Sequence, residues 1–288
     1  MICDVCGGRS VPSVCDWTFR CSECGLWQSS LVPAIDSDDS ALSEEDRRKA
    51  LEQLRLAQVE LTLDRLSRLR TLHSARLLDV GCAYGWFLEA AVSRGMVGVG
   101  VEPDATTAGA ARARGLHVIH GYFPDCLAGA EAFDIVVFND VLEHIPNVHA
   151  MIAACSGILT SEGLLVLSVP TSTGTLFRLA LGMARVGYQG PWRRLWQKSF
   201  PSPHVYYFNR MNLDRALQAH GFSRVDATET MTFHPTGLWS RMRFNPRSSR
   251  VLNLALYLGL LAAYPVYRTL GRADTELLIY RRNDDRAD

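Results

Sequence analysis

Residues Leu77–Glu89 read LLDVGCAYGWFLE, and this stretch decides the fold of the chain. A short apolar run ends in an acid, Asp79. Three small residues, Gly81, Ala83 and Gly85, then follow at two-residue spacing before an apolar, helix-like segment. Glycine permits a sharp turn and lets a ligand approach the backbone without a Cβ in the way. The pattern therefore predicts the strand–loop–helix entry of a nucleotide-binding βαβ unit.

A second buried strand is predicted in VGVGVEPD, residues Val97–Asp104, and it ends in Glu102. That acid lies 21 residues after Gly81, where a carboxylate can accept hydrogen bonds from ribose hydroxyls. A dinucleotide site would carry G-x-G-x-x-G, whose third glycine packs a helix against a strand beside a pyrophosphate. The segment Asp79–Gly85 reads DVGCAYG, departs from that pattern and favours a different cofactor.

The chain resembles the class I S-adenosylmethionine-dependent methyltransferases, whose first motif is an acid followed by a G-x-G-x-G-like loop. Residues Phe133–Pro146, FDIVVFNDVLEHIP, are similar to the fourth-strand motif of that family. Residues Ser161–Pro170, SEGLLVLSVP, are similar to its glycine turn and fifth strand. The resemblance implies S-adenosylmethionine as the cofactor and gives no information about the substrate.

The cofactor-binding residues are expected where the predicted strands end, because ligands of doubly wound sheets bind outside the carboxyl ends of the strands. The family often has an acid on the adenine amino group after the third strand. Here Asp125 comes late, so Phe123 or Tyr122 is the ring expected to stack on the adenine. The predicted site comprises Asp79, Gly81, Cys82, Ala83, Gly85, Glu102, Phe123, Asn139 and Asp140.

Apolar runs and turn signals alternate along the rest of this core. Strands are predicted near 76–80, 97–101, 116–119, 134–138, 163–169, 223–230 and 275–281. Helices are predicted near 85–94, 104–114, 147–159 and 211–220. The resemblance implies that the last strand is antiparallel and lies at the sheet edge. The fold class is therefore α/β, a Rossmann-like, doubly wound and mostly parallel sheet, with a small N-terminal zinc ribbon.

The zinc ribbon is predicted from four of the eight cysteines, which follow the spacing C-x2-C-x14-C-x2-C. They are Cys3, Cys6, Cys21 and Cys24. Glycine follows each pair, and two such knuckles can bring four thiolates into a tetrahedron around Zn²⁺. A module of residues 1–30 is too small to build a core alone, so a structural zinc ion is expected to stabilise it. Disulfides or redox dithiols are the alternatives.

Composition divides the remaining chain into two parts. Residues 31–73 are expected to form an acidic linker and a long helix that ends near His73 and packs on the core or on a partner protomer. Residues 74–288 are expected to form the methyltransferase domain, with irregular lid or substrate insertions at about 171–205 and 232–272. The N-terminal residues MICDVCGG lack a charged and apolar leader, so a cytoplasmic location is expected.

Residues Val251–Tyr267, VLNLALYLGLLAAYPVY, carry no charge and are flanked by arginines. The run is short for a membrane span and contains Asn253 and Pro265. A helix buried in the protein or packed against the lid is the first expectation. A helix on a membrane surface is the alternative, because basic residues lie just upstream. These are Arg241, Arg243, Arg247 and Arg250.

The net charge is zero, but residues Thr171–Arg250 hold twelve Arg and Lys against three acids. This excess predicts an anionic partner, with a solvated surface as the alternative. Aromatic residues of the same region are expected to stack on a sugar or base. They are Tyr188, Trp192, Trp196, Tyr206 and Tyr207.

An alcohol or amine that accepts a methyl group benefits from a general base. The candidate catalytic residues are His144, in the LEHIP turn, and His204 and Tyr207 at the end of the first insertion. Each histidine also has a structural alternative, as a hydrogen-bond partner of the loops. The sequence shows no dedicated Mg²⁺ site.

The first functional hypothesis is a methyltransferase for a small-molecule, anionic acceptor, through O-methylation of a sugar, glycan precursor or natural product. An RNA methyltransferase is an alternative, but residues 1–30 hold two arginines against three acids, so nucleic acid is not the expected partner. A lipid-linked acceptor at the membrane surface is a second alternative. A binding module without catalysis is a third, and the intact set of Asp79, Gly81, Gly85 and Glu102 argues against it.

Overall fold

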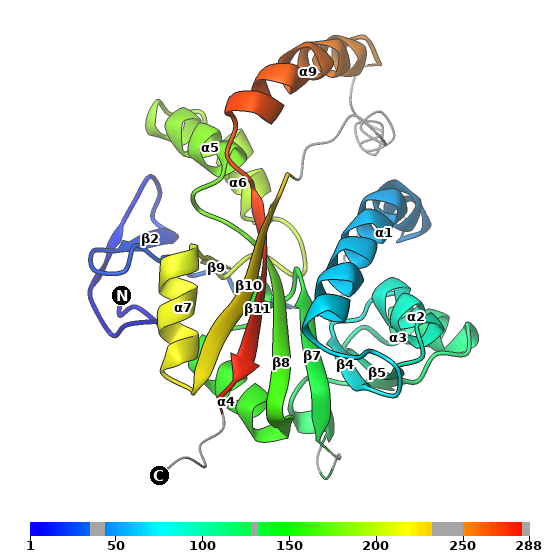
Figure 1. Ribbon diagram of the computed structural model, residues 1–288. Helices are drawn as coiled ribbons and strands as arrows, with labels where there is room; N and C mark the ends of the chain where they lie inside the picture. Colours follow the sequence, from blue (N-terminus) through cyan, green and yellow to red (C-terminus); the bar gives the residue numbers. More distant parts are fainter. Residues whose placement is uncertain (35–43, 128, 130–131, 232–249, 284–288) are drawn as a thin grey trace.

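Figure 1 shows the computed structural model of the chain, which describes residues 1–34, 44–127, 129, 132–231 and 250–283. A seven-stranded sheet in the order β10-β11-β8-β7-β4-β5-β6 forms its centre. The strands are β4 (Arg76–Val80), β5 (Val97–Glu102), β6 (Val118–His120), β7 (Phe133–Asn139), β8 (Leu159–Pro170), β10 (Phe222–Thr230) and β11 (Thr275–Arg282). The helices that cover it are α1 (Glu44–Leu69), α2 (Trp86–Ser93), α3 (Ala105–Ala113), α4 (Val148–Ile158) and α7 (Arg210–Gln218).

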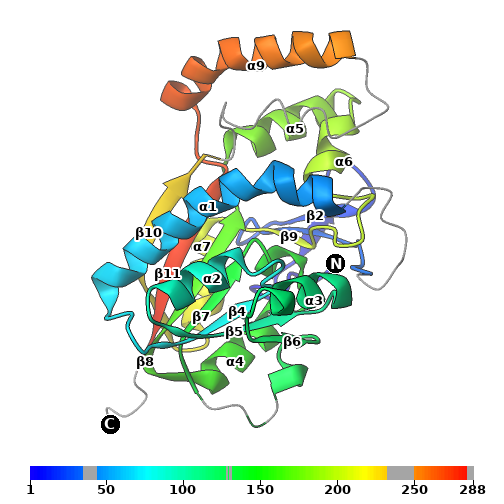
Figure 2. The same ribbon diagram turned by 90° about the vertical axis from the view of Figure 1, so that its right-hand side faces the viewer.

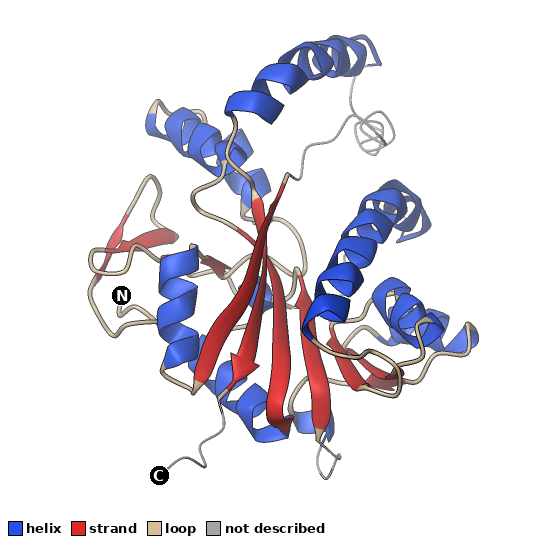
Figure 3. Cartoon of the chain, in the orientation of Figure 1, coloured by secondary structure: helices blue, strands red, loops and turns tan. Residues whose placement is uncertain are grey.

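Helices lie on both faces of this sheet (Figures 2 and 3). Successive side chains of a strand point to opposite faces. In β7, Ile135 and Val137 belong to the cluster that holds the buried residues of α1, α2 and α3. Val136 and Phe138 belong to the cluster that holds those of α4 and α7. The doubly wound α/β class predicted from the sequence is therefore confirmed.

The order in which strands are added reverses at β4, which pairs in parallel with β5 on one side and with β7 on the other. From β4 the chain adds β5 and β6 outward, and it then returns to add β7 and β8 on the opposite side. Such a switch opens a crevice at the carboxyl ends of the strands. The loops that follow β4, β5 and β7 therefore meet at one edge.

Two expectations about element ends are corrected. Strand β11 does not lie at the sheet edge, because it pairs antiparallel with β8 on one side and with β10 on the other. Its side chains from Thr275 to Tyr280 are buried accordingly, and β10 is the edge strand. Helix α1 ends at Leu69 rather than near His73, and it packs Leu63 and Leu66 into the core as expected.

A second, four-stranded sheet joins the N-terminal module to the main domain. Its order is β1 (Ser10–Pro12), β2 (Thr18–Cys21), β3 (Trp27–Ser29) and β9 (Tyr206–Tyr207). The first three strands belong to the cysteine module, whereas β9 comes from the chain after the first insertion and pairs antiparallel with β3. The module is thus built into the sheet pairing of the larger domain.

The first insertion is helical rather than irregular, with α5 (Thr175–Arg185) and α6 (Gly190–Leu195). Its aromatic residues pack inward against the cysteine module instead of lining a cleft. The buried cluster comprises Trp17, Trp27, Phe177, Ala180, Ala184, Trp192, Trp196 and Tyr207. The expectation that Trp192, Trp196 and Tyr207 stack on a substrate is therefore wrong, and so is that for the fully buried Tyr206.

The uncharged run near residue 260 forms helix α9 (Arg250–Leu270), which lies beyond α5 at one end of the molecule (Figure 1). The expectation of a buried or lid-packed helix is wrong for its described side chains, because Leu254, Leu258 and Leu270 are exposed. No helix of the described chain combines the length and the apolar character that a membrane crossing needs. Residues 232–249 of the second predicted insertion lie outside the described residues.

Candidate active site

The loop after β4 needs small residues because of its backbone angles and its close approach to the β7 loop. Gly81 and Gly85 have φ angles of 68° and 77°, in the left-handed region that favours glycine. A Cβ on Gly81 would lie 2.6 Å from a methyl group of Val141, which follows β7. Ala83 is also left-handed, with φ 47°. The glycine spacing thus holds the β4 loop in close contact with the β7 loop.

Glu102, at the end of β5, fastens this loop. Its Oε2 accepts a hydrogen bond from the Ala83 N–H at 2.9 Å, and its Oε1 accepts one from the Asp104 N–H at 3.0 Å. Burial raises the pKa of Glu102, although the two N–H donors act to lower it. A carboxylate has about four lone-pair sites, so both oxygens keep capacity for ribose hydroxyls.

Asp79 lies beneath the loop and is only 2% exposed. Burial, followed by the negative charge of Glu102, raises the pKa of Asp79 to about 8. Its Oδ2 has no hydrogen-bond partner among the described residues. Because an unpartnered buried polar atom is costly, this carboxyl fits a ligand that brings a donor or a positive charge. S-adenosylmethionine carries an ammonium group and ribose hydroxyls, which can donate hydrogen bonds to the carboxyl oxygens of Asp79 and Glu102.

Cys82 and Phe123, two further predicted cofactor contacts, both have buried side chains. The Cys82 thiol packs against Gly100, where an added Cβ would lie 2.6 Å from its sulfur, so only the backbone of Cys82 is available to a ligand. Phe123 is buried, with its ring 5.8 Å from that of Phe138, whereas Tyr122 is exposed. Tyr122 is therefore the more accessible ring for an adenine.

Asn139 and Asp140 end β7 beside the same loop. The Asp140 backbone is left-handed, and its Oδ1 accepts a hydrogen bond from the Ser168 hydroxyl at 3.2 Å. Its Oδ2 forms an ion pair with Arg55 of α1. Sequence reasoning missed Arg55, since nothing in a helical pattern 85 residues away signals this pairing.

A cluster of titratable groups lies in the turn after β7, which begins at Val141, the residue that faces Gly81. The His144 and His204 rings are 4.6 Å apart, and the His144 Nε2 is 4.0 Å from a carboxyl oxygen of Glu143. The Val205 N–H donates to the Glu143 carbonyl at 2.7 Å and so fixes the two segments together. The structure thus brings the two predicted histidines together, and it adds Glu143, which sequence reasoning overlooked although it precedes His144.

Burial shifts the pKa of two groups of this cluster, Glu143 and His204. Burial, and then the negative charge of Asp140, raises the pKa of Glu143 well above its ordinary value. Burial, and then the neighbouring His144, holds the pKa of His204 well below its ordinary value. His204 is therefore neutral at physiological pH. The ligand atoms of Glu143, His144 and His204 lie within 4.8 Å of one another, a set that can also hold a cation, which the sequence did not indicate.

Tyr207 lies beside His204, but its hydroxyl has another partner. Its hydroxyl donates to the Leu195 carbonyl at 3.0 Å, and its ring lies 4.9 Å from that of Trp196. Burial raises the pKa of Tyr207 well above its ordinary value. The Tyr207 ring lies 5.1 Å from that of His204, but its hydroxyl already donates to the Leu195 carbonyl, so the catalytic role of Tyr207 stays a prediction without further support.

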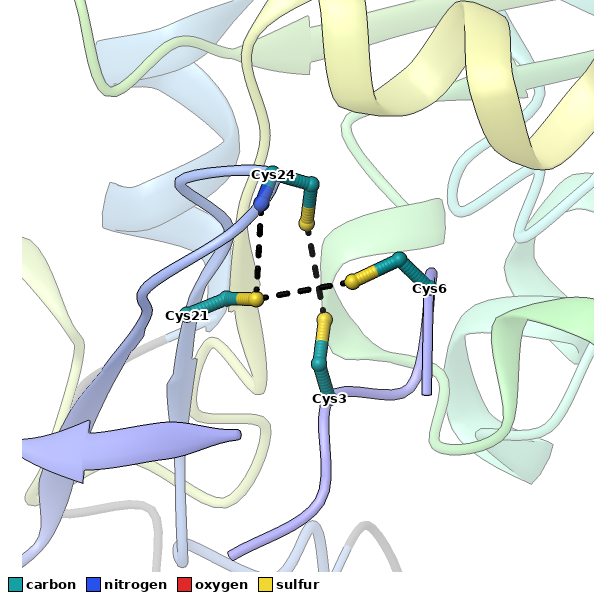
Figure 4. A group of neighbouring side chains, drawn as sticks. All are labelled: Cys3, Cys6, Cys21 and Cys24. Atoms are coloured by element: carbon teal, nitrogen blue, oxygen red, sulfur yellow. Dashed lines mark hydrogen bonds between the residues drawn. The ribbon is translucent and has the colours of Figure 1, made fainter. Parts of the chain in front are cut away.

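The side chains of the four predicted zinc ligands point toward one another within the cysteine module (Figure 4). The Sγ atoms of Cys3 and Cys24 are 3.5 Å apart, as are those of Cys6 and Cys21, and all four lie within 4.8 Å of one another. A tetrahedron with Zn–S bonds of about 2.3 Å has S···S distances of about 3.8 Å, so the thiols fit a zinc ion.

The backbone around one of these thiols, that of Cys21, also suits a metal, whereas burial raises the pKa of Cys3 and Cys24. The N–H groups of Glu23 and Cys24 donate to the Cys21 sulfur at 3.4 and 3.5 Å. Burial acts to raise the pKa of Cys21, but the N–H donors outweigh it and the pKa is lowered to about 7. A thiolate is the form that binds metal.

Fold and site together define a class I methyltransferase-type domain. Residues 46–227 match a family model described as a methyltransferase domain, and the chain belongs to that family. The prediction of a methyltransferase domain is confirmed by this match.

Curated proteins with methyltransferase names are similar to this chain in sequence. The chain is 32% identical over 121 residues to a ubiquinone biosynthesis O-methyltransferase of Bradyrhizobium sp. (strain ORS 278), covering 39% of this chain and 47% of the relative. The chain spans about half the length of the curated relatives it matches.

Solved structures share the fold. The cyclopropane synthase MmaA2 of Mycobacterium tuberculosis is 16% identical with a TM-score of 0.57, over 88% of this chain and 90% of that chain. Magnesium protoporphyrin IX methyltransferase of Synechocystis PCC 6803, solved with bound SAH, is 16% identical with a TM-score of 0.54, over 85% and 90%.

Proposed function

We propose that the protein transfers a methyl group from S-adenosylmethionine to an oxygen atom of a small anionic acceptor. The observation that carries this proposal is the pair of buried acids, Asp79 and Glu102, beneath a left-handed glycine loop, with two histidines beside it. The family match and the O-methyltransferase names of the curated relatives support it.

His144 is the proposed general base. Its Nδ1 lies 3.0 Å from the Pro203 carbonyl, and since a carbonyl only accepts, this nitrogen carries the proton. The Nε2 is then the basic nitrogen, suited to take the proton of an acceptor hydroxyl. The neutral His204 ring lies 4.6 Å from the His144 ring. When bound, S-adenosylmethionine supplies an electrophilic methyl group on a sulfonium sulfur, and the residues of the site align the acceptor oxygen with it.

The acceptor is proposed to be anionic because of the exposed charge on α6, which is followed by Trp196, whose carbonyl accepts a hydrogen bond from the His204 N–H at 3.1 Å. Arg193 and Arg194 of α6 are exposed, with Arg194 over the Phe200 ring at 4.9 Å. Guanidinium groups can form paired hydrogen bonds with phosphate or carboxylate oxygens. The burial of Trp192 and Trp196 removes the stacking argument for a sugar, so charge is the remaining support for the acceptor class.

The RNA alternative has less support. The ribbon residues hold more acids than arginines, and Trp27 is buried against α5 and α6 rather than offered to bases. We further propose a structural Zn²⁺ in the ribbon, which would cross-link its two knuckles through Cys3, Cys6, Cys21 and Cys24.

The test is a transfer assay with methyl-labelled S-adenosylmethionine, the full zinc-containing chain, a panel of phosphorylated and phenolic small molecules, and total RNA. Label on an oxygen of a small anionic molecule is the expected result. Arg193→Ala with Arg194→Ala should raise the acceptor KM and leave cofactor affinity unchanged, and Arg215→Ala, an exposed arginine of α7, is the matched control. Label in RNA alone, or an unchanged KM, would contradict the proposed acceptor class.

A further inference from the structure

Helix α5 presents an apolar stripe to the outside. Leu176, Leu179, Met183 and Val186 are exposed, with exposed fractions of 58% for Leu179 and 83% for Val186. Their spacing of three, four and three residues puts them on one helical face. The opposite face of α5, with Phe177 among its residues, is buried against the cysteine module. The helix is therefore apolar on both sides, and only one side is covered within the chain.

Helix α9 adds a second apolar surface at the same end of the molecule (Figures 1 and 2). Leu258 is 56% exposed, Leu270 is 81% exposed, and Leu254, Leu260 and Val266 are exposed between and before them. The two helices together carry eight of the twenty large apolar residues that are exposed in the described chain, and the exposed Val186 and Tyr188 follow α5. Such a concentration marks an interaction surface rather than scattered exposure.

Hydrogen bonds fix the end of α9 to the start of α5. The Thr175 hydroxyl donates to the Arg272 carbonyl at 3.1 Å, and the Leu176 N–H donates to a carboxyl oxygen of Asp274 at 2.7 Å. The Thr171 N–H, just beyond β8, donates to the Asp274 carbonyl at 2.9 Å. The two helices are thus held at the carboxyl edge of the sheet, the edge at which Ser168 contacts Asp140.

The charges of the two chain segments that form this surface have one sign. Residues 171–207 contain no acid, and neither do residues 254–273. The exposed cations of these segments are Arg178, Arg185, Arg193, Arg194, Lys198, Arg268 and Arg272. Apolar side chains flanked by cations match an anionic lipid surface. A second copy of the chain would bring like charges together, so it is a poor occupant.

We propose that the outer faces of α5 and α9, with Arg178, Arg185, Arg268 and Arg272, dock the protein on an anionic lipid bilayer. The apolar side chains enter the boundary between headgroups and acyl chains, and the arginines contact the headgroups. Docking in this orientation brings the carboxyl edge of the sheet close to the bilayer. An acceptor held in the membrane would then reach the site, a consequence that rests on the proposed function, whereas docking itself does not.

The test is flotation of the purified full chain with vesicles of phosphatidylcholine alone or mixed with phosphatidylglycerol, without methyl donor or acceptor. Wild-type protein should float with the phosphatidylglycerol vesicles at low salt and much less with phosphatidylcholine alone. Arg178→Glu with Arg185→Glu should weaken binding about tenfold or more, since each basic residue near an anionic surface contributes about 1 kcal/mol. Leu179→Asp with Met183→Asp should abolish it.

Met211→Asp is the matched control, because Met211 is an exposed apolar residue on α7, away from this surface. Circular dichroism and cofactor binding check that each variant is folded. Absence of wild-type flotation, or equal loss in Met211→Asp, would overturn the proposal. Sedimentation that shows a dimer broken by Leu179→Asp, with no vesicle binding, would assign the surface to a second copy instead. Since no methyl transfer is measured, failure of docking is distinguishable from failure of the proposed function.

Discussion

The Ser29 hydroxyl donates a hydrogen bond to the backbone carbonyl of His204 at 2.8 Å. The Ser29 N–H also donates to the next carbonyl, that of Val205, at 2.8 Å. Ser29 ends β3 of the cysteine module, whereas His204 belongs to the histidine pair beside the cofactor loop. The module therefore holds in place the backbone of a site residue that lies 175 positions away in sequence.

Ser29→Ala should lower the free energy of unfolding by about 1–3 kcal/mol, because the buried carbonyl of His204 loses its donor. Methyl transfer should also fall, while affinity for S-adenosylhomocysteine stays unchanged, because the Glu102 loop is not touched. Chemical denaturation and calorimetry measure the two effects. Ser22→Ala, whose exposed hydroxyl binds the Arg9 carbonyl within the module, is the control and should show neither effect.

Metal analysis of protein purified without chelator should give close to one zinc per chain. Cys21→Ser should lose the metal and loosen the module, since a structural zinc site contributes directly to folding. Because β3 supports His204, the variant should also lose transfer activity although its main sheet stays folded. Cys15→Ser, whose thiol contacts Thr18 outside the cluster, should keep both metal and activity. Native protein free of metal would refute the zinc ribbon.

His144→Ala should lower kcat by about 10²–10⁴, the usual contribution of a positioned base. Affinity for S-adenosylhomocysteine should not change, since His144 is not proposed to bind the cofactor. The fall of kcat at acidic pH that protonation of a general base causes should be lost in the variant. His117→Ala, an exposed histidine before β6, should behave as wild type. An unchanged kcat in His144→Ala would remove it from the catalytic role.

Asp79 should make the cofactor-free protein less stable as the pH rises. Burial and then Glu102 raise the folded pKa from 3.8 to about 8, so the folded state holds a proton that the unfolded state has lost. The favourable contribution is full below the unfolded pKa and is lost as the pH rises through about 8. Asp79→Asn cannot ionise and removes this dependence.

The advantage of Asp79→Asn over wild type should therefore grow by on the order of a few kcal/mol between about pH 4 and pH 8. Urea denaturation at both pH values measures it. Asp125→Asn, an exposed acid of the same edge, is the control. A difference that is the same at both pH values would mean that Asp79 is ionised in the folded state.

The central sheet was predictable because its strands are short apolar runs that end in polar or glycine residues. The strands β4, β5 and β7 and the glycine loop of Gly81 follow directly from such local patterns. The convergence of Gly81, Glu102 and Asp140 at one edge follows from parallel pairing, which places all strand ends together.

Long-range packing was not predictable in the same way. A two-residue strand such as β9 has no periodic signal, so its pairing with β3 is visible only in the fold. Trp192 and Trp196 look like exposed lid residues in sequence, but they supply the core that a ribbon of thirty residues cannot build by itself. Glu143 was overlooked because its protonation depends on burial and on the charges of Asp140 and Arg55, which only the fold brings together.

The most direct test of the central claim is calorimetric titration of S-adenosylhomocysteine into the full wild-type chain purified without chelator, into Glu102→Ala and into the control Glu60→Ala. Glu60 is an exposed acid of α1 that pairs with Arg94 away from the loop. The wild type and Glu60→Ala should bind equally, Glu102→Ala should bind more weakly by about 1–3 kcal/mol, and NAD should not bind. No binding by the wild type, or equal binding by Glu102→Ala, would contradict the assignment of a methyl-donor site to the edge formed by Asp79, Gly81 and Glu102.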